Sequence, residues 1–290
     1  MESMKDFKLK KTIFSNQTRL LIIAGLEGTG HHAMDAMFDI CSRQRPPLCE
    51  PEKILSSKLM VYDPPKRLVH GLFGAADTAE SLRMAGGIKS YIQGLRDKPG
   101  DHLFYVGLEA NYRNGMFSYP NFNGIFKTLD HPDIYQLGLL AEQAGIDYRI
   151  LVMQRNSKAI LKSVDRRDFG RANEEPKILI DNAAVLLTQL TLLDRRFYHC
   201  INYEDLAKIR TTPQLKQALV NFLHPKQMNS ILDQMLKVIK PSKNDPDEPK
   251  FILNDSIVIR NAKHDSNQDY LAFQLQARTS LIDNLCKSTY

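Results

Sequence analysis

The sequence has no tryptophan, no long apolar run and only four cysteines among 290 residues. Its most apolar early stretch, residues 20–24, is far shorter than the roughly 20 residues of a spanning helix, so no membrane span is predicted. The charged start MESMKDFKLKK is not followed by the apolar core of a signal peptide. Cys41, Cys49, Cys200 and Cys286 form no CxxC pair and no metal-ligand spacing, which predicts mostly reduced thiols and no metal site. The alternative is a Cys41–Cys49 bridge in an oxidising compartment.

A strong excess of charge is also missing. The 39 Lys and Arg residues exceed the 33 Asp and Glu residues by six, which suits an anionic ligand but not a nucleic-acid partner. The 43% apolar and 25% charged residues are typical of a globular protein and exclude a disordered or fibrous chain. No internal repeat or boundary divides the chain. We therefore predict one domain over residues 1–290, with residues 1–17 as a flexible N-terminal segment.

Short apolar runs alternate with stretches of helical spacing. The runs that predict buried strands are residues 20–24, 68–70, 104–107, 149–153 and 197–201. The helical stretches are residues 33–40, 77–95 with a break at Gly86-Gly87, 132–144, 157–167, 176–196 and 213–239. Residues 241–250 are polar and proline-rich, which predicts a loop, and the last forty residues give weak patterns. This alternation predicts an α/β, three-layer fold with a central, mostly parallel sheet flanked by helices.

The clearest motif is LLIIAGLEGTGHHAMDAMFDIC, residues 20–41. It predicts a strand, a glycine-rich turn and a helix, whose free N–H groups and positive end suit an anion. Gly25 and Gly30 have the glycine spacing of a P-loop, GxxxxGK[ST]. His31 and His32, however, replace the phosphate-binding Lys and the magnesium-binding Ser or Thr, which argues against a kinase-like or GTPase-like enzyme. We expect a phosphate-containing ligand whose chemistry needs no magnesium.

The same turn has two other interpretations. Residues 28–33 form a GxGxxA string, which is typical of dinucleotide binding when an acidic residue ends the next strand. Glu50 and Glu52 lie at the right distance, but RPPLCEPEK is too rich in proline for a central strand. A tight turn with only a structural role is the remaining alternative.

A second motif, residues 148–171, combines a strand with a basic helix. Arg155 ends the strand, where open α/β sheets bind ligands. Ser163 follows eight residues later on the same side of the predicted helix, and an Arg fork with a hydroxyl suits a phosphate monoester. The alternative is a solvated basic helix face that includes Lys158 and Lys162.

The order of these motifs resembles sulfotransferases that use 3′-phosphoadenosine 5′-phosphosulfate (PAPS). The loop at residues 25–32 resembles the family's 5′-phosphosulfate loop, and Arg155 and Ser163 resemble its pair for the 3′-phosphate. The string Tyr203-Glu204-Asp205-Leu206 resembles one that follows a later strand of the family. The resemblance implies a P-loop-like fold and a metal-independent enzyme that moves a sulfuryl group from PAPS to a hydroxyl or amine and releases PAP.

The resemblance also implies particular site residues. The cofactor-binding residues it implies are Leu26, Gly28, Thr29, Gly30, His31, Arg155, Ser163 and Tyr203. The main chain and the Thr29 hydroxyl would hold the 5′-phosphosulfate, while Tyr203 would lie near the nucleotide. The candidate catalytic residues are His31, His32, Glu27 and Glu109. Either histidine could also replace the family's loop cation by donating to the phosphosulfate.

Two departures separate the chain from the phenol- and steroid-specific cytosolic branch. Leu26 stands where the family usually has Lys or Arg, and IRNAKHDS replaces a glycine-rich basic motif near the C-terminus. A divergent branch is expected, with a non-catalytic nucleotide-binding protein of the same fold as the alternative. The acceptor would be a carbohydrate, a protein side chain or a small metabolite, and a homodimer is left open. The expected compartment is the cytoplasm, or the Golgi lumen if an anchor was removed.

Overall fold

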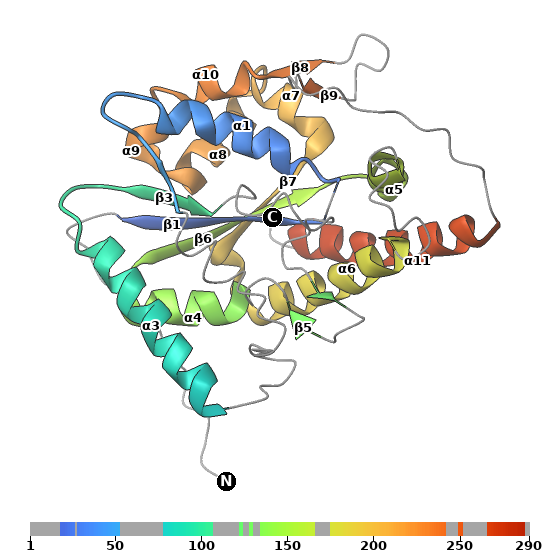
Figure 1. The fold of residues 1–290 in the computed structure, drawn as a ribbon. Coiled ribbons are helices and arrows are strands. Elements are labelled where there is room, and N and C mark those ends of the chain that lie inside the picture. Colours follow the sequence, from blue (N-terminus) through green and yellow to red (C-terminus); the bar gives the residue numbers. More distant parts are fainter. Residues whose placement is uncertain are drawn as a thin grey trace.

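The centre of the structure is a five-stranded sheet in which all strands run parallel, in the order β2-β3-β1-β6-β7. This computed structural model describes residues 18–26, 28–52, 78–106, 122–123, 128–129, 134–165, 175–241, 249–251 and 266–287. The strands of the sheet are β1 (Arg19–Gly25), β2 (Glu50–Pro51), β3 (Leu103–Val106), β6 (Asp147–Gln154) and β7 (Tyr198–Asn202). The predicted α/β class with a central parallel sheet is confirmed (Figure 1).

The inner strands β1, β3 and β6 are mostly apolar because helices cover both faces of the sheet. In β1, Leu21 and Ile23 belong to the hydrophobic cluster on one face, whereas Leu20 and Ile22 belong to the cluster on the other. This alternation is the two-residue period of a strand, with apolar side chains required on both sides. A continuous apolar run in the sequence is therefore what a strand in this position needs.

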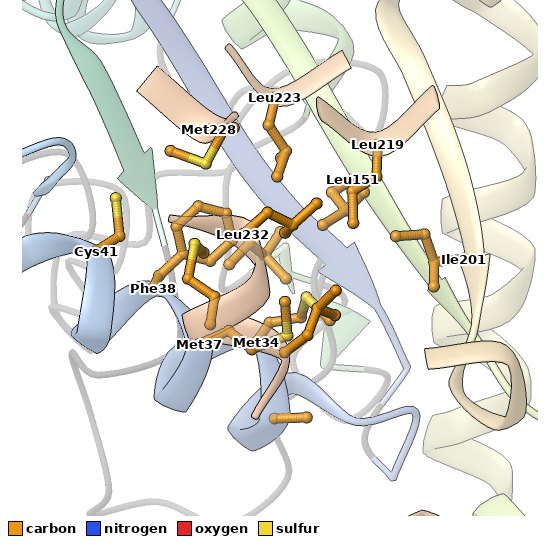
Figure 2. Close-up of a cluster of buried hydrophobic side chains, with 14 of the residues drawn as sticks. Met34, Met37, Phe38, Cys41, Leu151, Ile201, Leu219, Leu223, Met228 and Leu232 are labelled. Carbon is orange, nitrogen blue, oxygen red and sulfur yellow. The ribbon is translucent and has the colours of Figure 1, made fainter. Parts of the chain in front are cut away.

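Two layers of helices enclose the sheet (Figure 1). The helices on one face are α1 (His31–Ser42), α7 (Leu206–Ile209), α8 (Pro213–Leu223), α9 (Pro225–Met228) and α10 (Leu232–Leu236). Those on the other face are α3 (Thr78–Arg96), α4 (Ile134–Ala144), α6 (Glu175–Leu192) and α11 (Ser266–Lys287). Figure 2 shows the first interface, where Met34 and Phe38 of α1 meet Leu219 of α8 and Leu232 of α10 over Leu151 of β6.

The remaining elements are short. They are α5 (Ser157–Asp165), the 3₁₀ turns η2 (Arg195–Phe197) and η3 (Tyr203–Asp205), and the strand pairs β4 (Phe122–Asn123) with β5 (Thr128–Leu129) and β8 (Ile239–Pro241) with β9 (Pro249–Phe251). Both strand pairs are antiparallel. The predicted strand at residues 68–70 and the predicted flexible segment 1–17 lie outside the described residues.

Three sequence predictions about individual elements were wrong, and for one region no element was predicted. Helix α3 continues through Gly86-Gly87, because a glycine in a helix costs only about 1 kcal/mol and Gly87 is exposed. The predicted helix 213–239 is three helices, since His224 before Pro225 is extended and proline lacks the N–H needed to continue α8. Both ends of the predicted loop 241–250 pair as β8 and β9. The C-terminal region, which gave weak patterns, contains the 22-residue helix α11.

Arg19 joins the start of β1 to the end of α8. Its Nε donates to Asp147 Oδ2 at 2.7 Å, and its Nη1 donates to the carbonyl oxygen of Leu223 at 2.7 Å. The guanidinium thus stabilises the negative end of the helix and a half-buried carboxylate together.

We expect Arg19→Met to lower the free energy of unfolding in urea by about 2–3 kcal/mol. Arg43→Met, which removes an exposed pair with Asp39, should change it by less than about 0.5 kcal/mol, and equal effects would contradict this role.

Candidate functional site

The carboxyl ends of β1 and β6 form the natural ligand position of this sheet. The chain leaves β1 towards β2 on one side and leaves β6 towards β7 on the other, so the connections diverge between two neighbouring strands. Ligands of open α/β sheets bind at such a switch point. Gly25, the last residue of β1, pairs with Met153 of β6, and the segments that follow are the glycine turn and Arg155.

The turn after β1 is held by its own hydrogen bonds. The backbone N–H of Thr29 donates to the carbonyl oxygen of Leu26 at 3.1 Å, and the Thr29 hydroxyl donates to the same oxygen at 2.6 Å. Gly30 then begins α1 in the left-handed conformation, without a side-chain cap, and the first turn of the helix contains no acidic residue. The positive end of α1 is therefore not neutralised by a side chain from its own first turn.

Two glycines let this turn pack closely against neighbouring elements. A Cβ on Gly30 (φ +107°) would lie 2.3 Å from Cδ2 of Tyr203, closer than any side chain can approach a ring. A Cβ on Gly28 (φ +84°) would lie 3.1 Å from the Ile160 carbonyl oxygen and 3.3 Å from Cβ of Ser163. The turn is thus in contact with α5 on one side and with η3 on the other.

Arg155 lies directly against this turn. Its Nη1 donates to the carbonyl oxygen of Gly28 at 3.0 Å, and its Cζ lies 4.3 Å from the centre of the Tyr203 ring. Ser163 of α5, which is half-buried, adjoins the same glycine. The structure therefore brings together Gly28, Arg155, Ser163 and Tyr203, four of the residues expected at the cofactor site.

Other expected site residues point into the protein. Leu26 is 2% exposed and packs in a hydrophobic cluster with Ile160 and Leu179. Thr29 is 1% exposed and its hydroxyl is bound to Leu26, which differs from the ligand contact we expected. The ring of His31 is 3% exposed, and its Nε2 would lie 3.0 Å from a Cβ on Gly25. The His31 side chain is thus packed beneath the turn.

Three of the four catalytic candidates cannot be placed. Glu27 and Glu109 lie outside the described residues, and the side chain of His32 is not among those described. Of the catalytic candidates, the structure places the side chain of His31 alone. In the described part of the chain, no three His, Cys, Asp or Glu side chains gather as metal ligands would.

Glu204 is a site residue that the sequence analysis did not assign. Its Oε1 lies 3.7 Å from Nε of Arg155, and its carboxylate accepts the backbone N–H of Asn156. Burial raises the pKa of Glu204, while its own backbone N–H, Arg155 and Asn156 lower it. The clue available in the sequence was its position, since it follows Tyr203 at the carboxyl end of a strand.

The C-terminal helix α11 reaches the same region. Gln154, the residue before Arg155, donates its side-chain amide to Asp283 of α11. Burial raises the pKa of Asp283, while Lys287 and this hydrogen bond lower it. A disulfide joins Cys286 of α11 to Cys200 of β7, with a Cα–Cα distance of 5.8 Å. Helix α11 is thereby attached to β6, which is followed by Arg155, and to β7, which is followed by Tyr203 and Glu204.

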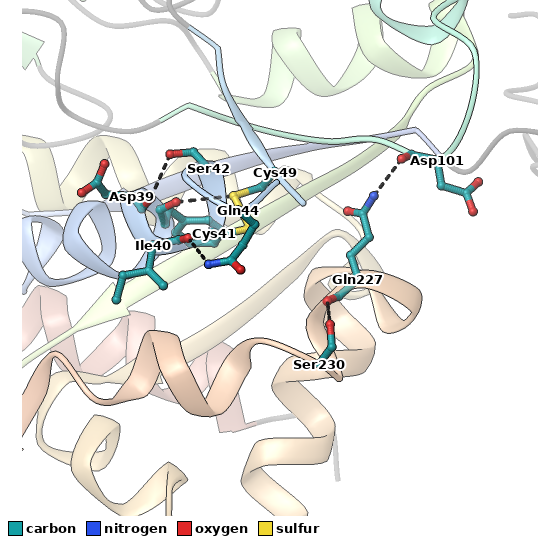
Figure 3. Close-up of a disulfide and its surroundings, with 10 residues drawn as sticks. Asp39, Ile40, Cys41, Ser42, Gln44, Cys49, Asp101, Gln227 and Ser230 are labelled. Carbon is teal, nitrogen blue, oxygen red and sulfur yellow. Dashed lines mark hydrogen bonds between the residues drawn. A yellow bond between two sulfur atoms is a disulfide. The ribbon is translucent and has the colours of Figure 1, made fainter. Parts of the chain in front are cut away.

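The cysteines correct the prediction of mostly reduced thiols. Besides the Cys200–Cys286 bond, Cys41 and Cys49 form a disulfide with a Cα–Cα distance of 5.5 Å (Figure 3). All four cysteines of the chain are therefore paired. The Cys41–Cys49 bridge connects the end of α1 to the segment before β2, where Cys49 Sγ also lies 3.5 Å from the carbonyl oxygen of Phe38.

The strand order bears on the dinucleotide alternative. That interpretation needs an acidic residue at the end of a strand next to β1, but β3 separates β1 from β2. Glu52 instead accepts a hydrogen bond from the Tyr91 hydroxyl at 2.8 Å, and Glu50 pairs with Lys98 at 3.3 Å. Both carboxylates are engaged at the sheet edge, away from the turn after β1.

No family model and no curated protein matches the chain. Within the described ranges, no helix is both long and apolar enough to cross a membrane. The function must therefore be inferred from the site itself.

Proposed function

We propose that the protein is a PAPS-dependent sulfotransferase that transfers a sulfuryl group to a hydroxyl or amine acceptor and releases PAP. The observation that carries the proposal is the meeting of Arg155 and Ser163 at Gly28. These two residues are eight positions apart, and the resemblance assigns them to the 3′-phosphate of the nucleotide. The turn they contact is the one that the resemblance assigns to the 5′-phosphosulfate.

The donor chemistry of the site fits such a ligand. Arg155 offers a fork of N–H donors and Ser163 a hydroxyl, which together suit a phosphate monoester. The start of α1, with no side-chain cap and no acidic residue in its first turn, suits a second anion. Because Arg155 contacts the turn itself, the two anion-binding positions are neighbours, as a single doubly phosphorylated nucleotide requires.

The contacts of Leu26 and Thr29 in the turn change the roles that the resemblance implies for these two residues. Leu26 has its side chain in the hydrophobic core, and the Thr29 hydroxyl is bound to the Leu26 carbonyl oxygen. We therefore assign the 5′-phosphosulfate to main-chain N–H groups at Gly28, Gly30 and His31 rather than to either side chain. In this role the turn acts as a P-loop-like anion site without a lysine.

The proposed mechanism needs positioning, charge stabilisation and a proton acceptor. When bound, PAPS supplies the sulfuryl group and a phosphate leaving group. Arg155 and Ser163 orient the nucleotide, and the N-terminus of α1 stabilises negative charge that develops on the leaving oxygen. A general base must accept the proton of the acceptor. The candidates for this base are His31, whose ring is packed beneath the turn, and His32, Glu27 and Glu109.

Nucleotide binding to an Arg155 variant tests this proposal. Arg155→Ala should weaken PAP binding in isothermal titration calorimetry by about 2–3 kcal/mol, or roughly 30- to 150-fold, because a charge-assisted contact to the 3′-phosphate is lost. The matched control is Arg149→Ala, which removes the same residue type six positions earlier, within β6, where Arg149 pairs with Asp147. The control should bind PAP like the wild type. Unchanged affinity in the folded Arg155→Ala protein would contradict the proposal.

A non-catalytic PAP-binding protein is the second candidate, and the burial of Leu26 favours it. A cation at this position would stabilise the leaving phosphate, and Leu26 cannot replace it. Turnover of radiolabelled PAPS with carbohydrate, protein and small-metabolite acceptors separates the two functions. Label transfer supports the enzyme, whereas PAP binding without transfer to any acceptor class supports the binding protein.

The two disulfides bear on the compartment. Disulfides persist in oxidising compartments and are rare in the cytosol, where thiols are kept reduced. Both bridges therefore favour the Golgi lumen over the cytoplasm. In that compartment the acceptor would be a carbohydrate or a protein side chain.

A further inference from the structure

Glu204 contacts the guanidinium to which the proposed function assigns a phosphate. It lies in η3, directly after Tyr203, and its side chain is 29% exposed. Its Oε1 is 3.7 Å from Nε of Arg155, while Nη1 of the same guanidinium bonds Gly28. The Arg155 side chain is more deeply buried than its partner, at 9% exposed. The Arg155 guanidinium therefore has a carboxylate of the protein beside it, where access to solvent is restricted.

A phosphate on Arg155 would put two anions beside one cation. A phosphomonoester carries nearly two negative charges at neutral pH, since its second pKa is about 6. When the phosphate takes over part of the contact with Arg155 and adds a negative charge nearby, the pKa of the carboxylate rises and its neutral form is favoured. The neutral carboxyl group can then donate its O–H to a phosphate oxygen, which a carboxylate cannot do.

We propose that the Glu204 carboxylate occupies Arg155 until a nucleotide phosphate replaces it, and that this exchange takes up a proton, so that nucleotide affinity rises as the pH falls. The inference rests on the proposed function, because it takes Arg155 as the phosphate-binding residue. Glu204 is a positioning residue in this account: it holds the guanidinium against Tyr203 and Gly28 before the ligand arrives.

The surroundings of Glu204 support proton uptake at this residue. Among the described residues, the charged groups that act on it are Arg155, from the segment after β6, and Asp205, from its own turn. Burial already raises the pKa of Glu204, and Asp205 raises it further, while the main chain at Glu204, Arg155 and the Asn156 N–H oppose them. Asp205 is itself paired with Lys208 at 3.1 Å. Replacing the favourable Arg155 contact by a phosphate shifts this balance towards the protonated form.

The test compares Glu204→Gln with Asp205→Asn in calorimetric titrations with PAP. Gln keeps the size of Glu and still accepts the Asn156 N–H, so the fold is retained. Titrations between pH 6 and 8.5, in two buffers with different heats of ionisation, give both the affinity and the number of protons taken up. The ionisation of PAP contributes equally to every titration. Differences in proton uptake between the proteins therefore come from the changed side chain.

We expect Glu204→Gln to bind PAP about tenfold more tightly than the wild type at pH 8, because no carboxylate then opposes the phosphate at Arg155, and to take up fewer protons over the pH range. Asp205→Asn should differ from the wild type by less than about twofold, since its pair with Lys208 is exposed. Glu204→Ala, as a second variant, should change affinity in the same direction.

If Glu204→Gln binds PAP no more tightly than the wild type and takes up as many protons, the inference is overturned while the proposed function stands. If the folded wild type and both Glu204 variants bind no PAP at any pH, the proposed function fails and the inference fails with it. The two failures are thus distinguished by whether the wild-type protein binds PAP.

Discussion

Gly30→Ala is expected to lower the free energy of unfolding by about 3 kcal/mol, from backbone strain and overpacking together, and to abolish PAP binding. The new Cβ would lie 2.3 Å from Cδ2 and 2.8 Å from Cε2 of Tyr203, on a backbone whose φ is +107°. The ring has little room to move aside, because Tyr203 is 5% exposed and the Arg155 guanidinium lies over the ring. Any shift of the ring therefore moves the proposed phosphate-binding residue as well. Urea unfolding and PAP titration of the folded protein measure the two effects.

Gly94→Ala is the matched control for this variant. Gly94 lies in the exposed part of α3, and a Cβ there would meet no atom within 4 Å. Alanine should therefore stabilise the helix by about 0.5–1 kcal/mol, the opposite sign to Gly30→Ala. Combining Gly30→Ala with Tyr203→Ala should cost less than the sum of the two single changes, because removal of the ring relieves the clash. A Gly30→Ala protein as stable as the wild type would show that this contact is not tight.

The sheet was predictable because its strands are buried on both faces. Residues 20–24 and 149–153 are apolar at every position or nearly so, and the structure extends each run by a few residues into β1 and β6. Helix α11 was not predictable in this way. Its buried side chains Leu275, Ile282 and Cys286 follow helical spacing, but exposed Tyr270 and Phe273 interrupt the pattern. The contact of α11 with α6, far away in the sequence, decides which of its faces is buried.

The site was predictable where position along a strand or helix determines proximity. Arg155 follows β6 directly, and eight residues make a little more than two helical turns, so Ser163 returns to the same side of α5. The direction of the side chains in the turn was not predictable. Whether Thr29 donates to a ligand or to Leu26 depends on how the turn closes, and local spacing does not determine that. Glu204 was missed because its contact with Arg155 joins the ends of two separate strands.

The Cys200–Cys286 disulfide gives the largest expected change in stability. Changing both residues to alanine should lower the free energy of unfolding by about 4.5 kcal/mol, because a cross-link over 86 residues removes much of the entropy of the unfolded chain. The matched control is the Cys41–Cys49 pair, with a separation of only 8 residues, for which the same change should cost about 2.5 kcal/mol. Denaturant titration of both double variants without reductant measures the difference. A larger loss from the shorter loop would contradict the expected order.

Thiol titration of the denatured wild type, without reductant, should find no free cysteine, and four reactive thiols would contradict both bridges.

Removal of the Cys200–Cys286 bond should also affect PAP binding at the candidate site. It releases the end of α11, which carries Asp283, the hydrogen-bond partner of Gln154. Because Gln154 directly precedes Arg155, looser docking of α11 should weaken PAP binding. Removal of the Cys41–Cys49 bond, which lies at the far end of α1, should leave PAP affinity unchanged.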